Sequence, residues 1–335
     1  MTRYLAQRLV GMVLVFVGIT VMTFVIAHVV PADPVRLYAG DNAPQSAVDA
    51  LRHAWGLDRP LYVQYLRYVD GLLHGNFGTS IRTQRPVTAD LRDYFPATFE
   101  LSTAAILVSI VLGIPMGVAS AIRRNRGLDH VIRVLSLGGI SMPIFWLGLL
   151  AVAVFYAHLH WLPAAGRLSE GVQPPPRITG MYVLDSLLTG RFHTLVDALR
   201  HLVLPALVLG SGGVGMIARM ARSSMLDVLA QDYIKTARAK GLRGRVVILR
   251  HALKNALLPT ITIIGVTYGG LLGGAVLTET IFSWPGLGLY VVSSMLAIDF
   301  PAIMGVTLVA AVTFSVVNLL VDLLYVYLDP RIQYG

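Results

Sequence analysis

The chain contains no cysteine among its 335 residues. Disulfides, thiolate metal ligands and cysteine nucleophiles are therefore excluded, and any region outside the cell must fold without covalent cross-links. Charged residues make up only 13% of the chain, whereas soluble domains carry about 25%. Hydrophobic residues make up 55%, and the mean hydropathy is +0.67. This balance indicates a protein embedded in a lipid bilayer.

Local sequence motifs of enzymes are missing as well. The phosphate-binding pattern GxxxxGK[ST] does not occur, and neither do the HExxH and GxSxG patterns of metalloproteases and hydrolases. His158 and His160 stand two residues apart, so their side chains would point to different faces of a helix, which favours an interfacial position over a metal site. We therefore predict a chain that is not an enzyme, with no catalytic residue, no metal site and no bound cofactor.

Six long apolar stretches run through the sequence, and each reaches or approaches the roughly 20 residues that a helix needs to cross a bilayer. The predicted spans are Leu9–Val30, Leu101–Ile122, Val134–Ala157, Leu202–Ala218, Ala256–Thr278 and Ala302–Val321. Pro115 and Pro143 lie inside the second and third spans and should kink them, because proline removes a backbone donor. The predicted fold class is an all-α integral membrane protein with six transmembrane helices.

The first span is preceded by Arg3 and Arg8 and resembles a secretory signal in that respect. Its apolar run exceeds the about 7–15 residues of a signal peptide, however, and no A-x-A cleavage pattern precedes Pro31. We expect this helix to remain in the mature protein as a true transmembrane span.

Positive charge is concentrated in two of the predicted loops. Residues 123–133 contain four arginines and residues 219–254 contain nine cations, whereas residues 31–98 balance seven arginines with seven aspartates. Because cations accumulate on the cytoplasmic side of membrane proteins, both basic loops and both termini are predicted to face the cytoplasm. The net charge of +9 would otherwise suit a nucleic-acid partner, but this one-sided distribution explains it, and we expect no such partner.

The chain divides into three regions: residues 1–30 with the first span, residues 31–98 on the extracytoplasmic side, and residues 99–335 with the other five spans. In the second region one helix should follow Pro44 and end at Gly56, another should follow Pro60, and a short third helix should follow Pro86. This helical segment could pack on the membrane domain, or it could be a docking platform for an outer partner. The sequence leaves both readings open.

Ionisable residues are almost missing inside the predicted spans, because His28, Glu100, His158, Glu279 and Asp322 all lie near span ends. An ion-coupled or proton-coupled transporter would normally bury carboxylates near the membrane midplane. Their absence indicates that any transport is driven by energy from elsewhere. An ion-coupled secondary transporter is kept as the alternative from another class.

Glycines recur every four residues along the fifth span. One row consists of Gly265, Gly269 and Gly273, and a second row consists of Gly270 and Gly274. Such rows of small residues let two helix backbones approach closely. They could serve packing within this chain, or they could form an interface with a second membrane subunit along which helices slide.

A patterned basic segment connects the fourth and fifth spans, within residues 219–255. Asp227–Lys240 is predicted to form a short helix. Its apolar face is expected to consist of Ala230, Tyr233, Ile234 and Ala237. The surrounding cations could serve only to keep this loop on the cytoplasmic side of the membrane. That role does not require a helix with an apolar face, so the pattern indicates a further role.

The end of this predicted helix carries its own signals. Lys240 suits the negative end of the helix dipole, and Gly241 suits a left-handed position just beyond it. Gly244 should break the chain again before a second helix, Arg245–Ala256, leads into the fifth span. The segment is therefore predicted to be a helix–glycine–helix elbow that is anchored to two spans, so that a pull on it moves both.

At these residues the sequence resembles the ATPase-contacting loop of permease subunits in binding-protein-dependent ABC importers. That loop reads Glu-Ala-Ala, three further residues and Gly. Ala237 and Gly241 occupy the second Ala and the Gly, while Lys235 and Thr236 replace the Glu and the first Ala. This form is similar to the dipeptide, oligopeptide, nickel and glutathione branch, and to the first of its two homologous permeases. Other segments resemble the same branch, in order along the chain: "PADPVRL" (31–37), "GLDRPL" (56–61), "GNFGTS" (75–80), "PATFEL" (96–101), "SMPIFWLG" (141–148), "ETIFSWPGLG" (279–288) and "DPRIQYG" (329–335).

The resemblance implies a subunit of a larger assembly in the bacterial inner membrane. Its partners would be a homologous second permease, two ATP-binding subunits on the cytoplasmic face and an extracytoplasmic substrate-binding protein. ATP and magnesium would be bound by the ATP-binding subunits and not by this chain. The predicted function is the passage of dipeptides or oligopeptides into the cytoplasm, with nickel chelates or glutathione as alternative substrates.

The resemblance also implies two groups of site residues. Those that contact the ATPase would be Asp232, Tyr233, Thr236, Ala237, Arg238, Lys240 and Gly241. A turn after the fifth span would border the outer mouth of the translocation path, with Glu279, Phe282, Trp284, Pro285 and Gly286. The same turn could instead be an interfacial anchor that has no contact with substrate.

Overall fold

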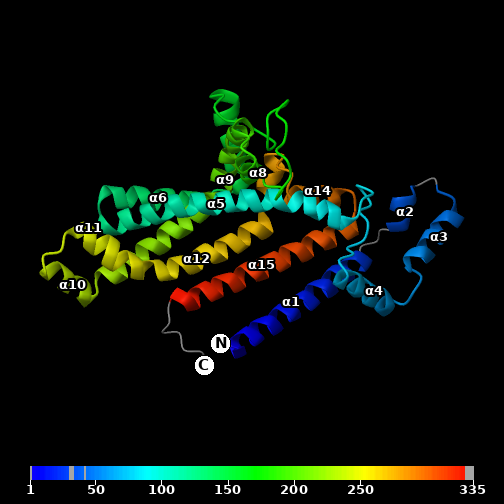
Figure 1. Ribbon diagram of the computed structural model, residues 1–335, viewed down its shortest axis with the longest axis horizontal. Coiled ribbons are helices and arrows are strands. Elements are labelled where there is room, and N and C mark those ends of the chain that lie inside the picture. Colours follow the sequence, from blue (N-terminus) through cyan, green and yellow to red (C-terminus); the bar gives the residue numbers. More distant parts are fainter. Residues whose placement is uncertain (1, 30–33, 41–42, 329–335) are drawn as a thin grey trace.

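The structure is a computed structural model that describes residues 2–29, 34–40 and 43–328. This described part is helical, and its only β contact is an isolated antiparallel bridge between Thr79 and Pro86. Figure 1 shows an elongated molecule in which most of the long helices run lengthwise. One end carries α2 (Pro34–Ala39), α3 (Gln45–Trp55) and α4 (Leu61–Leu73), and the opposite end carries α10 (Asp232–Ala239) and α11 (Gly244–Val246).

Five helices among the described residues are long and apolar enough to cross a membrane. They are α1 (Thr2–Val29), α5 (Val87–Ile122), α9 (Phe192–Leu229), α12 (Leu253–Gly274) and α15 (Phe300–Leu328). α12 continues a helical run that starts at Gly244 and includes the wider turn η2 (Val247–Ala252). The run ends at Gly274 rather than at Thr278 as predicted, because a separate short helix, α13 (Val276–Ile281), follows.

α5 and α9 begin well before the apolar stretches that were predicted as their spans. α5 starts at Val87, so the prediction of a separate short helix after Pro86 is wrong, and this stretch is the first part of the second span. α9 likewise starts at Phe192 rather than at Leu202. In both helices the added turns contain charged side chains, so a search for apolar runs does not include them. In the folded protein these side chains either pair with other elements or lie in solvent.

The third predicted span is not one helix. α6 (Gly127–Ser141) meets the pair formed by α7 (Ile144–Ala151) and the π-helical turn η1 (Val152–His158) at an angle of 105°. Met142 is extended, with ψ 129°, because the ring of Pro143 disfavours a helical conformation in the residue before it. The kink predicted at Pro143 is therefore a complete break. The described residues contain five candidate spans, or six if this bent pair is one.

The centre of the molecule is the contact between α5 and α9, whose backbones approach closely at glycines of α9. A Cβ atom on Gly210 would lie 2.7 Å from the carbonyl oxygen of Ala105, and one on Gly213 would meet Ser109. The hydroxyl of Ser109 uses this proximity to donate to the carbonyl oxygen of Gly210 at 2.9 Å. Glycine is required here because any side chain would separate the two helices.

The glycine rows of α12 lie in two different surroundings. A Cβ atom on Gly265 would collide with Val321, and one on Gly269 would press on Phe314, so these glycines pack against α15 of the same chain. Nothing lies within 4 Å of such an atom at Gly270 or Gly273. Of Gly274 only the helical backbone is described. Packing within the chain therefore explains part of the glycine pattern, whereas the face of α12 with Gly270 and Gly273 has no close neighbour among the described residues.

Both predicted outer helices before Pro86 are present. α3 ends where Gly56 takes a left-handed conformation (φ 68°), and α4 follows Pro60. α4 packs on α1 through Tyr65, whose ring lies edge-on to Phe24 with centroids 5.4 Å apart. The segment therefore packs on the membrane domain, and docking of an outer partner stays a prediction.

Candidate functional site

The elbow between α9 and α12 lies at the end of the molecule that is predicted to face the cytoplasm (Figure 1). α9 ends at Leu229, and Gln231 is extended (φ −69°, ψ 150°) before α10 begins. The single helix predicted from Asp227 to Lys240 is therefore wrong, and Asp227 belongs to α9. A new helix starts at Asp232 because its carboxylate lies in the first turn, where the helix dipole favours a negative charge.

The far end of α10 is closed as the sequence predicts. Gly241 takes φ 74°, and its amide donates to the carbonyl oxygen of Arg238 at 2.9 Å. Lys240 donates in the same way to Thr236 at 3.0 Å. A Cβ atom on Gly241 would meet nothing within 4 Å, so the backbone conformation alone requires glycine there. Gly244 begins α11 instead of breaking the chain.

One face of α10 is buried against its own chain. Ile234 and Ala237 are 0% and 7% exposed, and they pack in one cluster with Met225 of α9 and Val247 of η2. Burying an isoleucine side chain contributes about 1.5–3 kcal/mol, so α10 is fixed to both adjoining helices. The predicted apolar face was too wide, since Ala230 is exposed and Tyr233 is 43% exposed.

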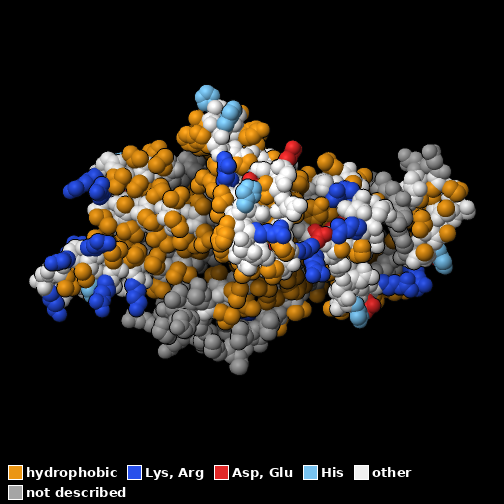
Figure 2. All heavy atoms as spheres, turned by 45° about the horizontal axis from the view of Figure 1, so that its top comes forward, with side chains coloured by type: hydrophobic (Ala, Val, Ile, Leu, Met, Phe, Trp, Pro, Cys, Tyr) orange, Lys and Arg blue, Asp and Glu red, His pale blue; other side chains and the backbone are white. Residues whose placement is uncertain are grey.

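The other face of α10 is open and basic. Its exposed side chains are Asp232, Tyr233, Lys235, Thr236 and Arg238, followed by Lys240. Lys235 pairs with Asp232 at 2.8 Å, but a pair this exposed contributes little to stability. Figure 2 shows lysine and arginine side chains gathered at this end of the molecule. α10 is thus a short rod with one side fixed to two spans and the other side presenting cations and a hydroxyl.

The second predicted group of site residues is organised around Glu279 of α13, whose side chain is fully buried. Its Oε1 accepts a hydrogen bond from the hydroxyl of Thr98 at 2.7 Å. Its Oε2 accepts from the amides of Gly288 at 2.6 Å and Leu289 at 3.1 Å, in the first turn of α14 (Leu287–Leu296). A Cβ atom on Gly286 would overlap the carboxyl group. Glu279 therefore joins α5 to the start of α14.

Burial raises the pKa of Glu279 to about 7, although its three hydrogen bonds act in the opposite direction. All three partners donate, so the arrangement suits a carboxylate, and the low polarity of its surroundings is what opposes ionisation. The group therefore titrates near neutral pH.

The aromatic residues of the same turn lie in the interior of the fold. Trp284 is 1% exposed and donates from Nε1 to the carbonyl oxygen of Ala97 at 2.8 Å. Phe282 is also 1% exposed and packs in a cluster with Ala151, Leu204 and Val208. Pro285 is partly buried. The turn is thus held by α5, α7 and α9, and its shape is fixed by this single chain.

A buried ion pair beside this turn escaped prediction. Arg167 donates to Glu100 of α5 at 2.6 Å, and each side chain is 6% exposed. The guanidinium lies over the ring of Tyr182, 3.6 Å from its centroid, at the start of α8 (Tyr182–Leu188). The pair joins the loop before α8 to α5. No local signal in the sequence links two residues so far apart along the chain.

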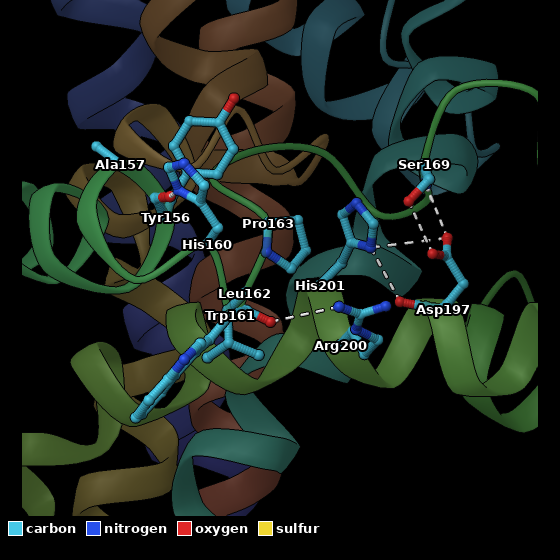
Figure 3. A pocket seen from close by; sticks show the side chains of 10 residues that line it. All are labelled: Tyr156, Ala157, His160, Trp161, Leu162, Pro163, Ser169, Asp197, Arg200 and His201. Atoms are coloured by element: carbon cyan, nitrogen blue, oxygen red, sulfur yellow. Dashed lines mark hydrogen bonds and ion pairs between the residues drawn. The ribbon is translucent and has the colours of Figure 1, made fainter.

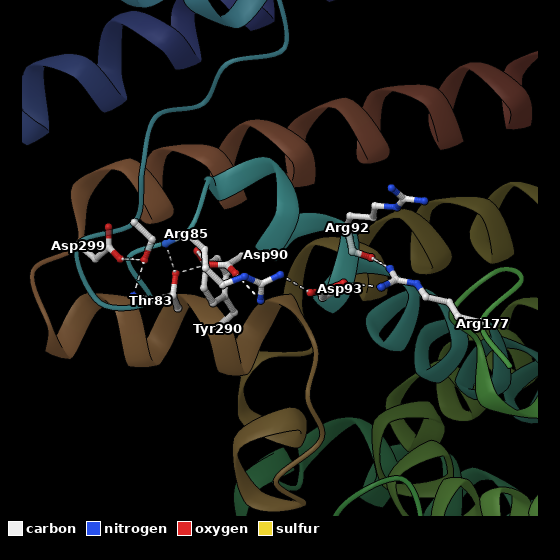
Figure 4. A network of polar contacts seen from close by, with 9 residues as sticks. Thr83, Arg85, Asp90, Arg92, Asp93, Arg177, Tyr290 and Asp299 are labelled. Atoms are coloured by element: carbon white, nitrogen blue, oxygen red, sulfur yellow. Dashed lines mark hydrogen bonds and ion pairs between the residues drawn. The ribbon is translucent and has the colours of Figure 1, made fainter. Parts of the chain in front are cut away.

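The start of α5 carries a chain of charged contacts (Figure 4). Arg85 lies 3.1 Å from the buried Asp90 and 2.8 Å from Asp93. Asp93 also pairs with Arg177 from the loop before α8, and Tyr290 of α14 donates to Asp90 at 2.9 Å. These contacts join the end of the outer segment to α14 and to the loop before α8.

Comparison with known proteins agrees with this geometry. Residues 113–334 match the model of the family described as "Binding-protein-dependent transport system inner membrane component". The chain belongs to this family. Residues 1–102 match the model of the corresponding N-terminal part. The protein is therefore a multi-pass component of the inner membrane that works with a binding protein. The resemblance to this family is confirmed, and the role of the elbow residues stays a prediction.

Three relatives match over essentially their whole length. A probable D,D-dipeptide transport system permease protein of Escherichia coli (strain K12) is 53% identical over 99% of this chain and 97% of that protein. A dipeptide transport system permease protein of Alkalihalophilus pseudofirmus is 44% identical over 100% of both chains. A glutathione transport system permease protein of Salmonella paratyphi A is 36% identical over 100% of both.

Proposed function

We propose that the chain is the permease subunit of an ATP-driven importer that passes dipeptides or short oligopeptides from an external binding protein into the cytoplasm. The observation that carries this proposal is end-to-end similarity to permeases named for dipeptide transport. The scarcity of ionisable groups within the predicted spans supports the same reading, because the energy would then come from ATP on other subunits.

In this proposal α10 is the element that an ATPase subunit contacts. Its exposed Arg238 and Lys240 would meet the ATPase, while the buried Ile234 and Ala237 hold α10 to α9 and η2. A displacement of α10 would therefore be passed to the spans before and after it rather than absorbed by a flexible loop. Two such ATP-binding subunits would hold the ATP and magnesium, and this chain would hydrolyse none.

A homologous second permease is the partner proposed for the uncovered face of α12. Gly270 and Gly273 have no neighbour there, and Val266 on the same helix is 52% exposed. Small residues beside an exposed apolar one suit the close approach of another membrane helix. The turn from Glu279 to Gly286 is held by other helices of the same chain. In this proposal it would border the outer mouth of the translocation path.

Glutathione is the second candidate substrate, since a relative at 36% identity is named for it. A nickel chelate stays a prediction without comparable support. The ion-coupled alternative is not retained, because the family depends on a binding protein.

Uptake by the complete complex in proteoliposomes tests the proposal. We expect labelled Ala-Ala to accumulate only when the binding protein and ATP are both supplied, and an ionophore that dissipates the proton gradient should leave the rate unchanged. Uptake that continues without ATP, or that stops with the ionophore, would contradict the proposal. Competition by excess glutathione would distinguish the two substrates.

A further inference from the structure

A cavity of about 560 Å³ opens between the end of η1, the loop after it and the start of α9 (Figure 3). Its volume falls in the range of about 300–1,000 Å³ that is common for small-molecule sites. Part of its wall is apolar or aromatic and consists of Tyr156, Trp161, Leu162 and Pro163. The polar part consists of His160, Ser169, Asp197, Arg200 and His201. None of these residues belongs to the elbow or to the turn around Glu279.

The one carboxylate in the wall is already occupied. Asp197 accepts hydrogen bonds from the amide of Ser169 at 2.7 Å and from its hydroxyl at 2.8 Å. The imidazole of His201 lies 3.7 Å from the same carboxylate. Because its oxygens are bound within the wall, Asp197 has little capacity left to attract a cation from outside.

The one guanidinium, by contrast, is available. Arg200 is exposed, and among the described residues its guanidinium makes one hydrogen bond, a long one of 3.4 Å to the carbonyl oxygen of Trp161. No acidic side chain in the described part of the chain forms an ion pair with it. Most of its five N–H donors therefore remain free to bind a carboxylate, a group that the planar guanidinium fits well.

Two histidines supply hydrogen-bond acceptors. Nδ1 of His201 lies 2.9 Å from the carbonyl oxygen of Asp197, and Nδ1 of His160 lies 2.8 Å from that of Tyr156. A carbonyl oxygen only accepts, so each Nδ1 must carry the proton, and in a neutral ring Nε2 is then an acceptor. His201 is 4% exposed, and the contacts given for its ring in the described part of the chain are made by Nδ1. Figure 3 shows this nitrogen on the side of the ring away from Asp197.

We propose that this cavity binds a small carboxylate that carries an N–H donor and an apolar side chain, such as a short peptide or an N-acylated amino acid. The carboxylate would bind Arg200, an N–H group would donate to Nε2 of His201, and an apolar side chain would lie against Trp161. The cavity thus combines one free cation, unfilled acceptors and an apolar wall, which is the set of groups that such a molecule needs. The inference goes beyond transport and does not depend on it.

Calorimetric titration of the assembled complex in nanodiscs, without binding protein or ATP, tests this proposal. The probes are Ala-Ala, its C-terminal amide and its N-acetyl derivative. We expect Ala-Ala and its N-acetyl derivative to bind with similar affinity, because both keep the carboxylate and an N–H donor. The C-terminal amide should bind at least tenfold more weakly, because it lacks the carboxylate. Arg200→Gln should weaken binding of Ala-Ala by a similar factor. The matched control is Arg92→Gln, which removes an exposed arginine of α5 outside the cavity.

Unchanged affinity in Arg200→Gln would overturn the proposal. Equal binding of inorganic phosphate or of short-chain phosphatidylglycerol would also overturn it, since the site would then take any anion. If Arg200→Gln fails to fold, Trp161→Ala at a position that is 61% exposed provides the same test, with the same expected loss. Because uptake is measured separately, a failure of dipeptide transport would not change this result.

Discussion

Arg222 of α9 binds the buried carboxylate of Asp129 of α6 through two parallel hydrogen bonds. Nε lies 2.8 Å from Oδ1, and Nη2 lies 2.9 Å from Oδ2. The hydroxyl of Ser120 and the amide of Asn125 donate to the same carboxylate, whose side chain has no exposed surface. One carboxylate thus joins α5, α6 and α9 close to the elbow. A displacement of α10 that reaches α9 is therefore expected to reach α6 as well.

Asp129→Asn should destabilise the protein by about 3 kcal/mol, because it leaves a partly buried arginine without its counter-charge. The measurement is denaturant unfolding of the purified chain in detergent. Arg219→Gln is the matched control, since Arg219 is an exposed cation one turn earlier on α9, and its loss should cost less than about 0.5 kcal/mol. Equal stability of the two variants would show that the Asp129–Arg222 pair does not hold these helices together.

The carboxyl group of Glu279 should make stability depend on pH. Its pKa is raised from 4.5 to about 7 in the folded protein by burial, so the folded state binds a proton more tightly than the unfolded state. The contribution of this group is therefore complete below pH 4.5 and is lost as the pH rises through about 7, by up to about 3 kcal/mol.

Glu279→Gln removes this titration and should flatten that part of the profile. Its own cost at low pH should stay within about 1–3 kcal/mol, since an amide replaces a hydrogen-bonded acid. The measurement is the unfolding temperature between pH 4 and pH 8. Parallel profiles for the variant and the wild type would exclude Glu279 as the source of the slope.

Two glycines of the same helix should respond differently to valine. Gly265→Val would collide with Val321 of α15, so we expect a drop in the unfolding temperature of the isolated chain. A Cβ atom at Gly270 would meet no described atom within 4 Å, so Gly270→Val should leave the stability of the isolated chain nearly unchanged. If a second permease covers this face, Gly270→Val should instead reduce co-purification of that subunit. Full co-purification would place the interface elsewhere.

Gly241→Val should uncouple ATP hydrolysis from uptake while the complex still assembles. Gly241 has φ 74°, which costs a β-branched residue about 1–3 kcal/mol, so the end of α10 would have to change its conformation. The measurement is the ratio of peptide imported to ATP hydrolysed. Gly244→Val is the control, because Gly244 has no positive φ and no atom within 4 Å of a Cβ. Wild-type coupling in Gly241→Val would remove this glycine from the mechanism.

Features that depend on a few neighbouring residues could be read from the sequence. Gly56 and Gly241 end helices in left-handed conformations as expected, and Pro60 precedes a helix. Five of the six predicted spans match single long helices, because a helix needs about 20 consecutive apolar residues to cross the hydrocarbon core. Such features are encoded locally, so no tertiary information was needed.

Features that depend on distant partners could not be read in this way. The first turns of α5 contain Asp90 and Asp93, so the sequence predicts a short helix separate from the apolar span, yet their charges are met by Arg85 and Arg177. Pro143 signals a kink, but a local signal of this kind does not specify the 105° angle between the flanking helices. The apolar face of α10 is narrower than its pattern because only Ile234 and Ala237 meet the cluster beneath it.

Site-directed cross-linking from α10 tests the central claim most directly. The chain has no cysteine, so Thr236→Cys introduces a single thiol at an exposed position of α10. Thr88→Cys, exposed at the start of α5 near the opposite end of the molecule, is the control. If α10 transmits the action of the ATPase, a short cross-linker should join the ATPase to Thr236→Cys and not to Thr88→Cys. A complex that is active in transport but gives no product from Thr236→Cys would contradict the account.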